Sequence, residues 1–198
     1  MAADYEQLRK NLRAFFDFTG KVVLFIGAGG KQLLDPAIET KKLIAIDQDF
    51  AALQELKARV SEDRKLDSVQ VIAAGFEEIT FLGDVVYFEF CLHEMADPDE
   101  ALAHAWTLAP EIVVFDHLPG SEWTYYAAEE GKVQRSTEAV ERQCIRRRQA
   151  FVAEQRFRDF DELIAKISVQ GPLAIERAQR FVGAANIVIP MTYALTLL

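Results

Sequence analysis

The chain has 198 residues, of which 51% are hydrophobic and 27% charged, a composition that suits one α/β domain with a sizeable core. Its formal net charge of −9 argues against the basic face with which proteins capture nucleic acid. No apolar run reaches the length of a membrane span, and the first residues lack a signal-peptide pattern. We therefore expect a single cytoplasmic domain, residues 1–198, without a membrane or nucleic-acid partner.

The first half of the sequence alternates helical and strand patterns. Apolar residues recur at helical spacing from Tyr5 to Phe18, within an N-terminal helical segment assigned to residues 1–19, and Gly20 ends it. Short runs of β-forming apolar residues follow, as in parallel sheets that are buried on both faces. The expected strands are 21–26, 43–46, 69–73, 84–90 and 111–115, and the expected helices include 50–60 and 97–108.

The rhythm changes after Pro119. The spacing predicts helices over 137–157 and 159–167, and then two strands over 173–181 and 185–197 that pair as an antiparallel hairpin. Strand–helix units with short connections imply right-handed parallel crossovers. The sequence therefore predicts an α/β fold, a doubly wound and mostly parallel seven-stranded sheet, whose antiparallel last strand lies beside strand 111–115.

Cysteine and histidine are scarce and scattered. Cys91 and Cys144 have no CxxC spacing, and the histidines His93, His104 and His117 are spread over separate segments. This pattern indicates neither a disulfide framework nor a metal site.

A glycine-rich turn and an acid follow the first two strands. Gly27–Gly30 comes directly after the first strand, where backbone N–H groups can approach a ligand closely. Asp47 closes the second strand, where its carboxylate can accept hydrogen bonds from two ribose hydroxyls. Together they predict a nucleoside site, although Asp47 could instead cap the next helix.

A dinucleotide-binding domain is the obvious competitor. Its G-x-G-x-x-G/A fingerprint ends on a small residue that allows tight helix–strand packing. Gly27 and Gly29 fit the first two positions, but Gln32 stands at the last one. The fingerprint therefore fails.

The ordered motifs resemble those of class I S-adenosylmethionine-dependent methyltransferases. Val23–Gly30 (VLFIGAGG) resembles their first motif, and Leu43–Asp47 the second, which carries the ribose acid. Val69–Phe81 resembles the segment that packs on adenine, and Asp84–Val86 the start of their fourth strand. Cys91–Met95 (CLHEM) resembles their LHH(L/M) stretch.

This resemblance implies S-adenosylmethionine as cofactor. The aspartate that commonly contacts the adenine amine is replaced by Gly75, where the Phe76 backbone amide and ring could serve adenine instead. Glu89 lies where the family's fourth strand approaches the methionine part of the cofactor. The implied cofactor-binding residues are Gly27, Ala28, Gly29, Asp47, Gln48, Gly75, Phe76 and Glu89.

The resemblance also implies a small-molecule acceptor beside strands four and five. His93 and His117 follow these strands, and either could act as a general base. Segment 117–157 is expected to form a lid over the methyl group, with Trp123, Tyr125 and Tyr126 as substrate contacts. The alternative is a non-catalytic, nucleoside-binding or regulatory protein that keeps the cleft. The sequence does not indicate an oligomeric state.

Overall fold

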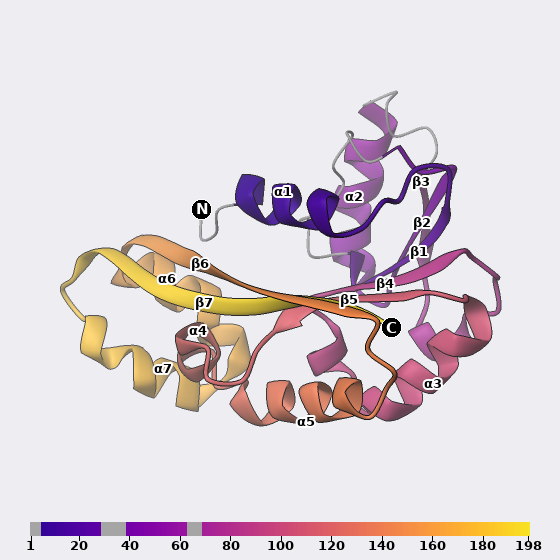
Figure 1. Ribbon diagram of the computed structural model, residues 1–198. Helices are drawn as coiled ribbons and strands as arrows, with labels where there is room; N and C mark the ends of the chain where they lie inside the picture. The colour runs from indigo at the N-terminus through magenta and orange to yellow at the C-terminus, as the bar shows by residue number, and fades with distance from the viewer. Residues whose placement is uncertain (1–4, 29–38, 63–68) are drawn as a thin grey trace.

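The apolar runs of the first half form parallel strands. The computed structural model describes residues 5–28, 39–62 and 69–198, in which the parallel strands are β1 (Val22–Ile26), β2 (Lys42–Asp47), β3 (Val69–Ala73), β4 (Val85–Glu89) and β5 (Ile112–His117). They lie in the order β3-β2-β1-β4-β5 (Figure 1). The order reverses between β1 and β4, and ligands of such sheets bind outside the carboxyl ends at that point.

Side chains that alternate along each strand fill two separate cores. In β1, Val23 and Phe25 pack toward α1 (Tyr5–Phe15) and α2 (Phe50–Glu62). Leu24 and Ile26 face the other way and pack toward α3 (Pro98–Leu108) and α5 (Glu130–Glu141). This period of two follows from the strand pleat. Figure 1 shows α1 on one side of the sheet and α3 and α5 on the other.

A long hairpin completes the sheet. β6 (Arg147–Asp159) pairs antiparallel with β7 (Ala185–Leu197), which also pairs antiparallel with β5. Over the described residues the sheet has seven strands in the order β3-β2-β1-β4-β5-β7-β6. The antiparallel strand beside β5, expected from the sequence at 185–197, is confirmed. Three helices lie along this hairpin (Figure 1), and they are α4 (Glu122–Tyr126), α6 (Phe160–Ile167) and α7 (Pro172–Ala178).

The helix expected over 137–157 is wrong. Helix α5 ends at Glu141, and most of the remainder is β6. Ala153, Gln155 and Phe157 are buried on every second position of that strand, while Val152 between them is exposed. The residue types tolerate a helix, and pairing with the distant β7 decides the outcome, since strand preference depends strongly on tertiary context.

The strand expected over 173–181 is also wrong. Gly171, with φ of 100°, and Pro172 at the first helical position begin α7, and the 3₁₀ turn Gln179–Phe181 follows it. Ala174 and Ala178 are buried one helical turn apart. Proline is favoured at a helix N-terminus and cannot donate to a strand ladder. The hairpin partner of β7 is therefore β6.

Other boundaries agree with the sequence. Asp97 caps α3 by accepting the N–H groups of Asp99 and Glu100, and Asp159 caps α6 by accepting that of Glu162. Short 3₁₀ turns cover Phe76–Glu78, Leu92–Glu94 and Ser168–Gln170. Among the helices of the described ranges, none is long and apolar enough to cross a bilayer.

Candidate functional site

The first cavity lies at the carboxyl ends of β1, β2 and β4. It has a volume of about 330 Å³, and its lining includes Gly27, Asp47, Gln48, Phe76 and Glu89. The residues come from segments far apart in sequence, and the strand reversal between β1 and β4 brings them together. We call it the donor cavity.

Gly27 shapes the floor of the donor cavity through its backbone. Its φ is +78°, and its N–H donates to the Ile46 carbonyl at 3.1 Å. A Cβ atom placed there would lie 2.6 Å from the Cβ of Cys91. Only glycine satisfies both conditions without strain. Ala28 is buried in the core rather than on the lining, and Gly29 lies outside the described residues.

Asp47 is not the cap of α2. That cap is Asp49, whose Oδ1 accepts the N–H groups of Ala51 and Ala52 at 2.9 and 3.1 Å. Asp47 Oδ1 accepts the N–H of Asp49 at 2.9 Å, which fixes the carboxylate at the cavity wall. The alternative interpretation of Asp47 as a helix cap is therefore wrong.

Glu89 brings a buried carboxyl to the same wall. The Tyr87 hydroxyl donates to Glu89 Oε2 at 3.2 Å. Burial raises the pKa of Glu89 well above its ordinary value, and the hydrogen bond from Tyr87 offsets only part of this. A cationic ligand group would favour the ionised form.

The two residues expected to serve adenine, Gly75 and Phe76, are less accessible from the donor cavity than the sequence suggests. The Phe76 ring packs edge-on against Phe88 and His104, with ring centroids 5.3 and 4.9 Å away. It lines the donor cavity from within the core. Gly75 is not on the lining, and a Cβ there would meet the Glu77 carboxylate at 2.4 Å.

A second cavity of about 370 Å³ adjoins the first. Its lining includes His93, His117, Trp123, Glu129, Gln155 and Phe157. Phe90 and Glu94, which follow β4, line both cavities. We call it the acceptor cavity, and a molecule in either one would contact this shared border.

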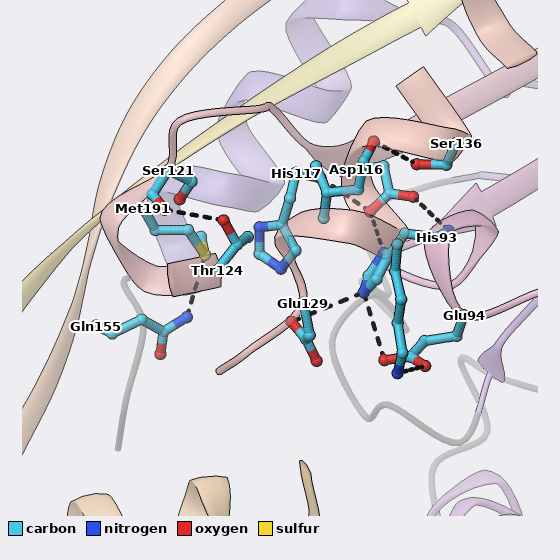
Figure 2. Close-up of polar contacts among 12 residues, drawn as sticks. His93, Glu94, Asp116, His117, Ser121, Thr124, Glu129, Ser136, Gln155 and Met191 are labelled. Atoms are coloured by element: carbon cyan, nitrogen blue, oxygen red, sulfur yellow. Dashed lines mark hydrogen bonds and ion pairs between the residues drawn. The ribbon is translucent and has the colours of Figure 1, made fainter. Parts of the chain in front are cut away.

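His93 is held firmly by Asp116. Asp116 Oδ2 accepts the His93 backbone N–H at 3.0 Å, and Asp116 Oδ1 lies 2.6 Å from His93 Nδ1. Nε2 then points to Glu94 and Glu129, whose oxygens are 3.6 and 3.9 Å away (Figure 2). Burial opposes the charged ring, but Asp116, Glu129 and Glu94 outweigh it and raise the pKa of His93 to about 9.

His117 differs from His93 although the two rings lie 5.3 Å apart. Burial, followed by the charge of His93, lowers the pKa of His117 to about 3. Its Nδ1 is buried without a hydrogen-bond partner among the described residues. His117 therefore stays neutral beside a charged neighbour.

Glu129 completes the polar wall. Its carboxylate lies below and between the two imidazole rings in Figure 2. Burial raises the pKa of Glu129 to about 7, and Glu94 adds to the effect while His93 opposes it. One ligand atom from each of His93, His117 and Glu129 lies within 4.8 Å of the others. A metal site was not expected from the sequence, because His93, His117 and Glu129 lie in three separate segments without a ligand spacing.

The three aromatic residues expected to contact the substrate lie in different surroundings. Trp123 lines the acceptor cavity and stacks on Phe157, with ring centroids 5.9 Å apart. Tyr126 is buried against Phe181, and its hydroxyl accepts a hydrogen bond from Arg180. Tyr125 is 47% exposed beneath the Arg177 guanidinium. Of the three, Trp123 alone is on the lining.

Sequence reasoning missed Asp116 and Glu129 as site residues. Asp116 carried a signal, since it lies directly before His117 at the end of a strand. Glu129 carried none, because it is one of two adjacent acids in a polar connector. Lys166 and Gln155 on the lining come from segments whose placement depends on the hairpin.

Comparison with known proteins supports the fold. No protein-family model matches the chain, and no curated protein matches its sequence. A proposed methyltransferase from Bacillus halodurans superimposes with a TM-score of 0.68 at 14% identity, covering 98% of this chain and 97% of that one.

Two further similar structures are named after different molecules, RNA and magnesium protoporphyrin IX. A proposed RNA methyltransferase from Pyrococcus horikoshii has a TM-score of 0.59 at 16% identity, covering 98% of this chain and 80% of that one. Magnesium protoporphyrin IX methyltransferase from Synechocystis PCC 6803, solved with bound SAM, has a TM-score of 0.56 at 11% identity, covering 97% and 77%. At these identities the likeness establishes the fold, a Rossmann-like methyltransferase fold, as the sequence predicts.

Proposed function

We propose that this chain binds S-adenosylmethionine in the donor cavity and transfers its methyl group to a small molecule in the acceptor cavity. The observation that carries the proposal is that Phe90 and Glu94 line both cavities, which therefore share a border. Methyl transfer needs donor and acceptor in line and in contact. Two adjoining cavities, the first of them at the strand reversal of this fold, meet that need.

The donor cavity fits the parts of this cofactor. Asp47 offers a carboxylate to the ribose hydroxyls, and Gly27 lets backbone approach the ligand without a Cβ. Glu89 lines the cavity with a buried carboxyl, which we assign to the amino group of the methionine part, and we assign Gln48 and Phe76 to adenine. When bound, the cofactor supplies a methyl group on a positively charged sulfur, which is already activated for displacement.

The acceptor cavity has an apolar and a polar side. Trp123 and Phe157 exclude water on one side, and His93, His117 and Glu129 line the other. We assign the two histidines to the nucleophilic atom of the acceptor, since they face the cavity beside the shared border. A cavity of this size suits a small molecule, and the net charge of −9 disfavours RNA. General-base catalysis by either histidine stays a prediction.

Calorimetry and a transfer assay test the proposal in turn. The purified chain is titrated with S-adenosylmethionine and, separately, with NADH. We expect saturable binding of the first and none of the second, and the reverse would refute the proposed cofactor. Metabolite pools and RNA are then incubated with cofactor labelled on its methyl group. Label in small molecules supports the proposal, whereas label in RNA overturns the acceptor class. Cofactor binding without transfer would favour the non-catalytic alternative.

A further inference from the structure

Two histidines and a glutamate from three elements converge on one point of the acceptor cavity. His93 comes from the turn after β4, His117 ends β5, and Glu129 lies between α4 and α5. All three are buried, and their ligand atoms lie within 4.8 Å of one another. Their closeness depends on the fold, because the three segments are separate in sequence.

We propose that His93, His117 and Glu129 bind a divalent transition-metal ion of the zinc type at the wall of the acceptor cavity. Two imidazoles and one carboxylate suit Zn²⁺, Co²⁺ or Fe²⁺, whereas Mg²⁺ and Ca²⁺ prefer oxygen ligands throughout. Three protein ligands leave coordination positions open toward a substrate.

The surroundings of His93 match those of a metal-binding histidine. Metal-bound histidines usually donate their other ring nitrogen to a carboxylate, which fixes the ring. Asp116 Oδ1 lies 2.6 Å from His93 Nδ1, so Nε2 is presented to the cavity. Glu94 Oε1, 3.6 Å from Nε2, adds negative charge on the same side.

His117 and Glu129 can complete the set with small movements. No partner among the described residues holds His117 by its buried Nδ1, so the ring can present either nitrogen. Ligands at about 2.0–2.2 Å from zinc require the three atoms to approach by roughly 1–1.5 Å. The preceding Ala128 is left-handed (φ 57°), and the Glu129 that follows it lines the cavity.

The ion would also define the acceptor, a consequence that rests on the proposed function. Its open positions would face the cavity lined by Trp123 and bordered by Phe90. The favoured acceptor is then a small molecule with a hydroxyl or carbonyl oxygen beside the atom that receives the methyl group, because such an oxygen binds the ion and orients that atom.

The test is titration of the metal-free full-length chain with Co²⁺, followed by visible absorption. We expect one equivalent to give the bands of a low-coordinate nitrogen–oxygen site, and Zn²⁺ to remove them. Glu129→Gln and His117→Gln should weaken Co²⁺ binding at least about a hundredfold, and Asp116→Asn about 10–100-fold. Glu122→Gln, which changes an exposed carboxylate of α4, should bind as the parent does.

Calorimetry with S-adenosylmethionine on the same variants separates this inference from the proposed function. Unchanged cofactor binding shows that the variants are folded. Cobalt that binds with no site bands, or equally to Glu129→Gln and the parent, would overturn the metal site while leaving the proposed function standing. If the parent protein itself did not bind S-adenosylmethionine, the proposed function would be refuted instead.

Discussion

The donor and acceptor cavities are built in different ways. The donor cavity is formed by strand ends and tight turns, with Gly27 and Asp47 fixed by backbone hydrogen bonds to neighbouring segments. The acceptor cavity is formed by side chains from α4, α6 and the β6–β7 hairpin, converging on the end of β5. The parallel sheet therefore determines the shape of the donor cavity. Packing of the second half of the chain determines the shape of the acceptor cavity.

Their ionisable groups differ as well. In the donor cavity, burial is the main influence on the Glu89 carboxyl, and the Tyr87 hydroxyl and the charge of Arg9 offset only part of the rise in its pKa. At the acceptor cavity, the pKa values of His93, His117 and Glu129 depend on one another's charges and on that of Asp116, which lies behind His93. This contrast suits one cavity to recognition of a fixed ligand and the other to chemistry. Changes in one cavity should leave the other largely intact.

Trp123→Ala should have the largest effect, and it should spare the donor cavity. Trp123 is buried on Phe157, and truncating a buried aromatic costs about 3–5 kcal/mol of stability. That corresponds to a melting temperature lower by roughly 6–20 °C. Methyl transfer should fall, while affinity for S-adenosylmethionine, measured below the melting temperature, stays within about twofold of the parent. Trp123→Phe is the milder control, and a parallel loss of cofactor affinity would break the comparison.

Gly27→Ala should do the reverse. An alanine at φ +78° is strained, and its Cβ would collide with Cys91, together costing about 2–4 kcal/mol. Cofactor affinity should fall with stability. Gly20→Ala is a matched control, since Gly20 has φ of 71° but no atom within 4 Å of an added Cβ. Calorimetry and thermal melts on both variants separate the collision from the backbone strain, and equal losses would show that Cys91 plays no part.

Glu89→Gln should stabilise the chain at neutral pH. The folded-state pKa of Glu89 is raised by burial, so folding favours the neutral carboxyl. Stability from the parent's neutral Glu89 is present below the ordinary glutamate pKa and is lost as pH rises through the folded value. The variant should be more stable than the parent near pH 8 and almost equal to it near pH 4. Urea unfolding at both pH values measures this, and a gain that is the same at both would contradict the assignment.

Tyr125→Ala should have the smallest effect. The ring is half exposed, and the Arg177 guanidinium carbon lies 4.2 Å from its centroid. Losing that contact costs about 0.5–1 kcal/mol at an exposed site. Methyl transfer should not change, because Tyr125 is not on the cavity lining. A large fall in transfer rate at unchanged stability would restore Tyr125 to the acceptor site.

The sequence predicts the donor half of this molecule far better than the acceptor half. The strands β1–β5 and the position of Asp47 follow from short apolar runs between helices, a local signal. The hairpin partner of β7 could not be found in this way, because β6 has charged, helix-tolerant residues and forms through distant pairing. The available clue in the sequence was the alternation of Phe151, Ala153 and Phe157 with the charged residues Glu154, Arg156 and Arg158.

Prediction of the acceptor side of the site from the sequence failed for the same reason. His93 and His117 could be located from strand ends, but their partners Asp116 and Glu129 depend on how the turns fold back. Tyr125 and Tyr126 lie next to Trp123 in sequence, and the short helix α4 points them in other directions. Residues two apart on a helix, as Trp123 and Tyr125 are, do not share a face. Tyr126, three residues after Trp123, is buried but packs against Phe181.

The division of labour between the cavities is tested most directly by S-adenosylmethionine calorimetry on Asp47→Ala and Glu129→Gln. Asp47→Ala should weaken binding by about 2–4 kcal/mol, or roughly 30- to 1000-fold, because it would remove the two hydrogen bonds proposed between the ribose hydroxyls and the carboxylate. Glu129→Gln should bind within about twofold of the parent, since Glu129 lines only the acceptor cavity of the two. Unchanged affinity in Asp47→Ala, or equal losses in both variants, would contradict the account.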